Sequence, residues 1–154
     1  MSTLHDLYKN LEQHKELSVG DNSNKFLDIA EQIVLQKDPS SIPILLKYFS
    51  DDGEFGDYSW VCESLMIDLE HYDSTIHVKA LLENLPTLIS NAPLWANDMF
   101  SRILNGETYK QIFIDNMHLA PKAALSTLFD IMEKESQHHQ ELIKELRDRL
   151  ANHG

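Results

Sequence analysis

The sequence has little cysteine, glycine and proline, and these shortages exclude several classes of protein. The one cysteine, Cys62, rules out an intramolecular disulfide and favours a reducing compartment, so we expect a cytoplasmic protein. No apolar run approaches the ~20 residues that cross a bilayer, and the N-terminus lacks a signal-peptide pattern. Five glycines and five prolines, abundant Leu, Ile, Glu and Lys, and the lack of alternating β-branched runs indicate a helical protein.

Basic residues are missing from one part of the chain. The formal net charge is −12, and residues 48–78 carry eight Asp and Glu residues but no Lys or Arg. Such concentrated charge costs stability through self-repulsion unless a cationic partner offsets it. Direct binding to nucleic acid is not expected, because phosphate contacts require clustered Lys and Arg.

Glycines, prolines and capping residues divide the chain into about eight or nine predicted helices. The fifth of them is expected to begin after a cap at Asp73 and Ser74, and Pro86 is expected to bend or end it. Short helices with short links indicate antiparallel hairpins stacked side by side, so we predict one all-α domain over residues 1–154. The expected helices cover residues 3–16, 23–36, 41–49, 57–72, 74–88, 93–105, 107–117 and 121–150, the last as one helix or two joined near SQHHQ.

One stretch makes the architecture more specific. The segment DPSSIPILLKYFSDDGEFGDYSWVCESLMIDL contains an Asp-Pro break, a short apolar helix, an acidic turn and a second amphipathic helix. This order resembles a HEAT-type unit. The same period does not recur cleanly elsewhere, so we predict a compact HEAT-like α-solenoid or bundle without a regular repeat array.

The predicted helix at 57–72 has two apolar sides. Trp60 and Ile67 lie two turns apart, opposite the expected core stripe, and Glu63 and Glu70 flank them. This side is either a recognition surface for a basic protein or a second buried face against the next hairpin. The acidic loop before the helix is likewise either part of that surface or a solvated turn. The core stripe comprises Tyr58, Val61, Cys62, Leu65, Leu69 and Tyr72.

No motif of a metal site or catalytic centre is present. An EF-hand loop beginning at Asp51 would place Gly53, Phe55 and Cys62 at ligand positions, and none of them fits. The eight histidines form no HExxH motif and are expected at the surface. Cys62 lies on the apolar stripe, where a thiol is inert packing. We therefore predict a protein that is not an enzyme and that uses no cofactor or metal.

Four segments between residues 38 and 113 are similar to a known family. They are SDDGEFGD, YSWVCESLMIDLEHYD, VKALLENLPTLI and APLWANDMFSRILNGETYKQIF. Together they resemble the all-helical immunity proteins of bacterial polymorphic toxin and contact-dependent growth inhibition systems. The resemblance implies binding of a cognate toxin domain, commonly a cationic ribonuclease or deoxyribonuclease, and its inhibition inside the producing cell. It implies no catalytic residues.

The charge pattern and the resemblance lead to one hypothesis. We expect a monomer that forms a 1:1 heterodimer with a basic toxin, such as an RNase, and covers its cationic active-site region. Two other functions suit the acidic chain: a nucleic-acid mimic, and a HEAT-like adaptor that binds a cellular basic protein. A HEAT-like repair enzyme would need a basic concave face, which is not expected. The predicted partner-binding residues are Asp51, Asp52, Glu54, Asp57, Trp60, Glu63, Ile67 and Glu70.

Overall fold

Helices make up all the regular structure of the computed structural model, which describes residues 3–17, 20–51 and 59–152. This confirms the predicted all-α class. None of the described helices is long and apolar enough to cross a bilayer. The α-helices are α1 (Leu4–Gln13), α2 (Asn22–Leu35), α3 (Ser41–Leu46), α4 (Ser59–Leu69), α5 (Ser74–Glu83), α6 (Leu85–Asn91), α7 (Pro93–Asn105), α8 (Glu107–Asn116), α9 (Lys122–Glu135) and α10 (Gln140–Asn152).

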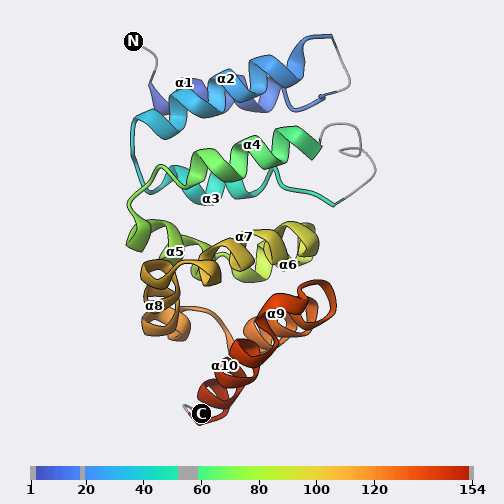
Figure 1. The fold of residues 1–154 in the computed structure, drawn as a ribbon. Coiled ribbons are helices and arrows are strands. Elements are labelled where there is room, and N and C mark those ends of the chain that lie inside the picture. The colour runs from blue at the N-terminus through green and yellow to red at the C-terminus, as the bar shows by residue number, and fades with distance from the viewer. Residues whose placement is uncertain (1–2, 18–19, 52–58, 153–154) are drawn as a thin grey trace.

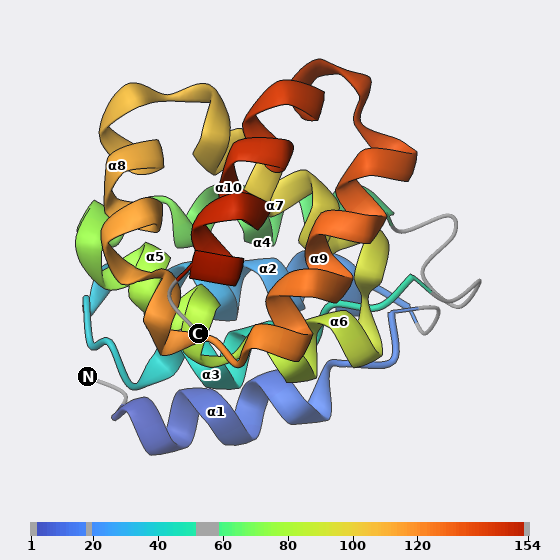
Figure 2. The same ribbon diagram turned by 90° about the horizontal axis from the view of Figure 1, so that it is seen from below.

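The helices are stacked in layers along the molecule (Figure 1). The α1–α2 hairpin forms the first layer, α3 and α4 form the second, and α5 to α7 form the third. Helix α8 packs on α5 and α7, and the α9–α10 hairpin closes the stack against α6 and α7. Seen along the stack, α1, α3 and α6 lie toward one side, and α8 and α10 toward the other (Figure 2).

Ten α-helices lie among the described residues, where eight or nine were expected, because the predicted helix at 74–88 is divided and residues 121–150 form two helices, one of the two alternatives. The predicted cap at Asp73 starts α5, where its carboxylate accepts hydrogen bonds from the amides of Thr75 and Ile76. The chain leaves helical geometry at Asn84, and Pro86 lies in the first turn of α6, where its missing N–H costs nothing. A 3₁₀ turn, Gln137–His139, separates α9 from α10.

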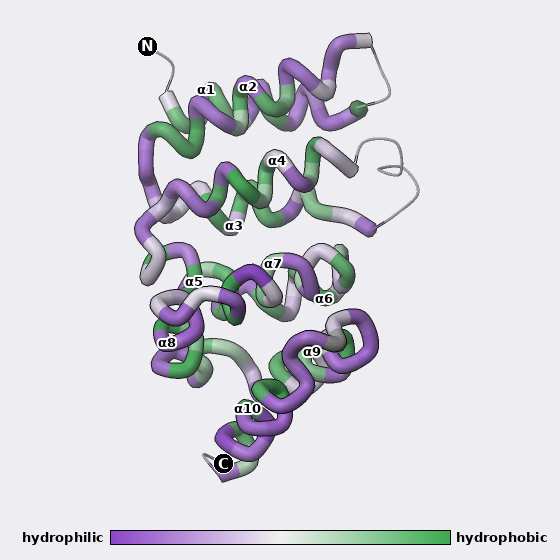
Figure 3. Tube along the Cα trace, in the orientation of Figure 1, coloured by the Kyte–Doolittle hydropathy of each residue, from purple (hydrophilic) through white to green (hydrophobic). Residues whose placement is uncertain are grey.

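The buried apolar residues of the described ranges form one core that extends from Leu7 in α1 to Leu146 in α10. Hydrophobic and hydrophilic residues alternate in short stretches along the helices of the stack, as expected where one side of each helix faces the core (Figure 3). The rings of Phe100 and Phe113, 5.7 Å apart and edge to face, join α7 to α8. Burying each such ring contributes roughly 1.5–3 kcal/mol, so these contacts hold the layers together.

Among the histidines that the structure describes, His77 is buried, contrary to the expectation that all eight lie at the surface. His77 on α5 is 4 % exposed, and its ring meets Tyr109 of α8 edge to face at 6.1 Å. Its Nδ1 atom has no hydrogen-bond partner in the structure. Burial lowers the pKa of His77 to about 4, although the charge of Glu70 opposes the shift. The ring is therefore neutral at pH 7.

The buried His77 predicts a loss of stability in mild acid. His77 takes up a proton at about pH 6.5 in the unfolded chain but only near pH 4 in the folded protein. Above pH 6.5 the ring is neutral in both states and the free energy of unfolding is unaffected. Between pH 6.5 and 4 only the unfolded chain is protonated, so the free energy of unfolding falls as the pH drops. We expect a loss of about 3 kcal/mol in the free energy of unfolding across this window, measured by urea denaturation at a series of pH values.

The matched control is His77→Phe, which keeps a ring against Tyr109 but cannot titrate. Carboxylates contribute equally to both proteins, so the difference between their pH profiles isolates His77. Identical profiles would show that His77 does not account for the acid sensitivity.

Candidate functional site

Helix α4 exposes one apolar side to solvent. Trp60 and Ile67 are each 42 % exposed, whereas Val61, Leu65 and Leu69 are buried in the core. Of the two alternatives left by the sequence, burial against the next hairpin is therefore excluded for Trp60 and Ile67. Their exposure leaves a helix face open to a partner, and their role in binding stays a prediction.

Glu63 lies on α4 next to this apolar side and is exposed. It makes no hydrogen bond or ion pair with any other residue that the structure describes. Its carboxylate influences Asp98 and Arg102, both on α7, which places its charge on the α7 side of α4. Glu63 is thus a free anion beside exposed apolar side chains.

Asp51 has a structural role that the sequence did not reveal. Its carboxylate accepts hydrogen bonds from the backbone N–H groups of Leu94 and Trp95, at 2.6 and 3.3 Å. Helix α7 has no side-chain cap of its own, so Asp51 supplies the missing acceptor from 43 residues earlier in the chain. The cap joins the segment before α4 to the third layer.

Glu70 also has a partner within the fold. The Arg102 guanidinium donates two hydrogen bonds to its carboxylate, from Nε at 2.7 Å and from Nη2 at 2.6 Å. This ion pair raises the pKa of Arg102, with partial burial opposing the shift. The bidentate geometry ties the end of α4 to α7 and neutralises a cation at the edge of the acidic region.

Further carboxylates come from neighbouring helices. On α7, partial burial raises the pKa of Asp98, a hydrogen bond from Asn97 opposes this, and the charges of Asp51 and Glu63 raise it further. On the α2 side, partial burial and then the charge of Glu31 raise the pKa of Asp68. Burial is the main cause of both raised pKa values, and repulsion between carboxylates adds to it; a bound cation would relieve that repulsion.

A groove of about 480 Å³ lies between α4, α7 and the end of α9. Met66 and Trp95 provide apolar surface in it, and Glu63 and Asp98 provide carboxylates. Glu135 adds a third carboxylate, and Arg102, which also lines the groove, is already paired with Glu70. A groove of this composition can take a long side chain with an aliphatic stem and a cationic head. We call Trp60, Ile67, Glu63 and Asp98, together with this groove, the α4 face.

Three of the predicted contact residues, Asp52, Glu54 and Asp57, lie outside the described residues. Sequence reasoning missed Asp98, because nothing in its own helix marks it as a neighbour of α4. Only the packing of α7 next to α4 brings Asp98 within electrostatic reach of Glu63.

No cluster of metal-ligating side chains occurs among the described residues. Burial raises the pKa of Cys62 to about 11, with a hydrogen bond from Ser50 opposing the shift. The thiol is therefore protonated at neutral pH and is a poor nucleophile.

The family model of Immunity protein 30 matches residues 13–113. The chain belongs to the Immunity protein 30 family. A search of curated proteins and a search of solved structures gave no match. The family match confirms the resemblance to immunity proteins, and it implies that the protein binds a cognate toxin.

The matched part of this Immunity protein 30 member runs from the end of α1 into α8. It therefore includes all of α4 and α7, and with them the described residues of the α4 face. Helices α9 and α10 lie beyond the match, although α9 contributes Glu135 to one end of the groove.

The cap made by Asp51 predicts a loss of stability on substitution. Asp51→Ala removes the acceptor for two N–H groups at the start of α7 and should lower the free energy of unfolding by about 1 kcal/mol, the usual effect of losing a helix cap. Urea denaturation followed by circular dichroism measures the change.

Glu63→Ala is the control, because Glu63 is exposed and has no hydrogen bond in the described structure. It should change stability by no more than ~0.5 kcal/mol. A loss of the same size in both variants would argue against the capping role of Asp51.

Proposed function

We propose that this immunity protein neutralises a basic toxin domain, a nuclease such as an RNase, by binding it through the α4 face. The observation that carries the proposal is the exposure of Trp60 and Ile67 beside Glu63, which makes no ion pair with any described residue. Exposed aromatic side chains at the centre of a surface supply affinity, and the charges around them speed the encounter of oppositely charged partners.

The charge of the face matches the chemistry of a nuclease. Such an enzyme holds phosphates with Lys and Arg side chains, and the same side chains can pair with Glu63 and Asp98. The pKa of Asp98 is raised mainly by burial and further by the charges of Asp51 and Glu63, and a bound cation would relieve this repulsion. The protein would then block the toxin by covering its cationic active-site region, with no chemistry of its own.

The eight predicted contact residues take different roles in this proposal. Trp60 and Ile67 make apolar contact, and Glu63 is joined by Asp98 as a direct partner of cations. Asp51 and Glu70 hold α7 against the α4 segment and contribute charge from positions already fixed by hydrogen bonds. Asp52, Glu54 and Asp57 remain predicted contributors of charge.

The complex is proposed to form in the cytoplasm of the producing cell, with one copy of each protein. A net charge of −12 opposes self-association, and a cationic toxin removes that repulsion by binding. The exposed apolar side chains of α4 are then covered by the toxin and not by a second copy of this chain.

We expect the gene of the toxin next to the gene for this protein, and the direct test uses the toxin domain that it encodes. Surface plasmon resonance should show a complex, and mass measurement in solution should give one copy of each chain. Trp60→Ala should raise the Kd by about 30-fold or more, because a central aromatic contact contributes about 2 kcal/mol or more. Trp60→Phe, which keeps a ring at this position, should recover much of the affinity.

Charge reversal measures how much the carboxylates contribute to the rate of association, apart from the apolar contacts. The double variant Glu63→Lys, Asp98→Lys should slow association by about tenfold at low salt, with a smaller effect at high salt. Glu141→Lys, at the start of α10 and away from α4, is the control and should bind like the unchanged protein. If both the double charge-reversal variant and Trp60→Ala still bind the toxin tightly, the interface lies on another surface of the protein.

A further inference from the structure

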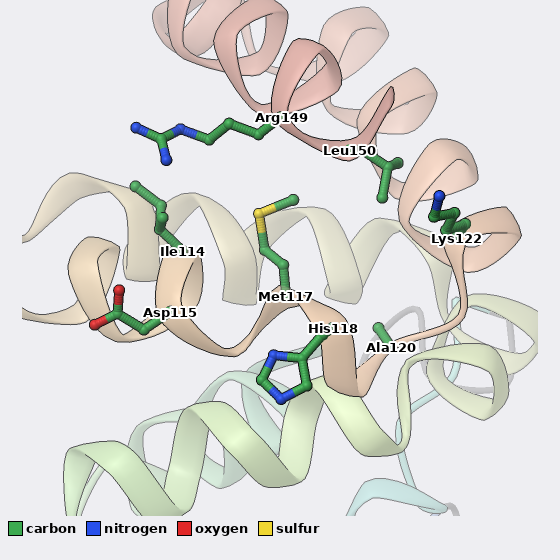
Figure 4. Close-up of a pocket in the computed structure, with 8 residues that line it drawn as sticks. All are labelled: Ile114, Asp115, Met117, His118, Ala120, Lys122, Arg149 and Leu150. Carbon is green, nitrogen blue, oxygen red and sulfur yellow. The ribbon is translucent and has the colours of Figure 1, made fainter. Parts of the chain in front are cut away.

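A second concave site lies at the other end of the helical stack (Figure 4). It has a volume of about 480 Å³ and opens between the end of α8, the 3₁₀ turn Met117–Leu119 and α10. All of its lining residues follow residue 113, so they lie outside the family match. They are Ile114, Asp115, Met117, His118, Ala120, Lys122, Arg149 and Leu150.

The floor of this pocket is apolar. Met117 occupies its centre in Figure 4, with Ile114 on one side and Leu150 on the other. Met117 is 8 % exposed, and Ile114 and Leu150 are half-buried. An unbranched, polarisable methionine side chain adapts to apolar ligands of different shape. The volume falls within the range of roughly 300–1,000 Å³ that is typical of small-molecule sites.

The rim of the pocket carries cations. Arg149 and Lys122 lie at opposite ends, and His118 lies below Met117 (Figure 4). Lys122 makes no hydrogen bond or ion pair with any described residue. Arg149 is paired only with Glu145 one turn away, at 3.3 Å and in solvent, an interaction that contributes about 0.5 kcal/mol or less. Two weakly engaged cations therefore flank an apolar floor in a protein of net charge −12.

Asp115 is the single carboxylate in the lining of this pocket. Its Oδ1 accepts a hydrogen bond from the side-chain amide of Gln111 at 2.8 Å. This oxygen is therefore already engaged within the protein. Its negative charge still disfavours a ligand with several anionic groups. The pocket is therefore best matched by one negative charge attached to an apolar body.

We propose that this pocket binds a small amphiphilic carboxylate, with its carboxylate on Lys122 or Arg149 and its hydrocarbon part against Met117, Ile114 and Leu150. An N⁺–H···O⁻ contact fixes the charged end, and burial of the hydrocarbon provides the rest of the affinity. This site does not depend on the proposed function of the α4 face, because the two share no residue.

The test compares three eight-carbon probes on the full-length protein, below the concentrations at which they form micelles. The probes are octanoate, neutral octanol and cationic octyltrimethylammonium. NMR of methyl-labelled methionine follows the methyl group of Met117. We expect a saturable shift with octanoate and affinity at least about tenfold lower for the cationic probe.

Two variants locate the binding. The double variant Lys122→Gln, Arg149→Gln should lower octanoate affinity by about tenfold or more, and Met117→Trp should fill the pocket and abolish binding. Lys134→Gln, in the last turn of α9 and outside the pocket, is the matched control and should bind octanoate like the unchanged protein. Circular dichroism confirms that each variant is folded.

Several outcomes would overturn the proposal. One is that octanoate causes no saturable change in the chemical shift of the Met117 methyl group. Another is that all three probes bind with equal affinity, which would show that the pocket does not distinguish the charge of the ligand. The probe comparison needs no variant, so it decides the question even if a variant fails to fold. A fourth probe is an acidic peptide that contains leucine. If this peptide binds and octanoate does not, the ligand of the pocket is a protein segment and not a small molecule.

Discussion

The burial of only one apolar side of α4 is the constraint on which the rest of the site depends. Val61, Leu65 and Leu69 pack into the core next to α2, and this packing fixes the rotation of the helix about its own axis. Trp60 and Ile67 must then point outward, because they lie on the opposite side of the same helix. A surface aromatic is thereby held on a rigid element, which reduces the entropy lost when a partner binds.

Two polar contacts connect this helix to the layer that follows. Asp51 caps α7 from the segment before α4, and Glu70 binds Arg102 of α7 just after α4 ends. Contacts at both ends of α4 hold α7 in register, so Asp98 comes to lie near Glu63. Asp51, Glu70 and the α5 cap Asp73 therefore serve the fold, whereas Glu63 makes no hydrogen bond or ion pair with the described residues. The charge of residues 48–78 combines structural and exposed carboxylates.

Much of the fold follows from local signals. Helix α7 was predicted over 93–105 and is found at Pro93–Asn105, because Pro93 and Gly106 mark its ends. The Asp73 cap of α5 was also predicted. The division at Asn84 was not, since Pro86 alone is compatible with either a kink or a new helix and the packing of neighbouring layers decides between them. The burial of His77 was missed for a related reason: its surroundings come from α8, more than 30 residues later.

The sequence by itself determined the helical class, the approximate helix ranges, the two apolar sides of α4 and the kind of family to which the chain belongs. These properties depend on residue types at short spacings, which can be read along one segment. The predicted core stripe of α4 is buried as expected, but tertiary structure alone decided that the opposite side with Trp60 and Ile67 stays exposed, which carboxylates have partners, and that Asp98 joins the α4 face. Those outcomes depend on distances between residues far apart in the chain, and such distances are set only when the layers pack.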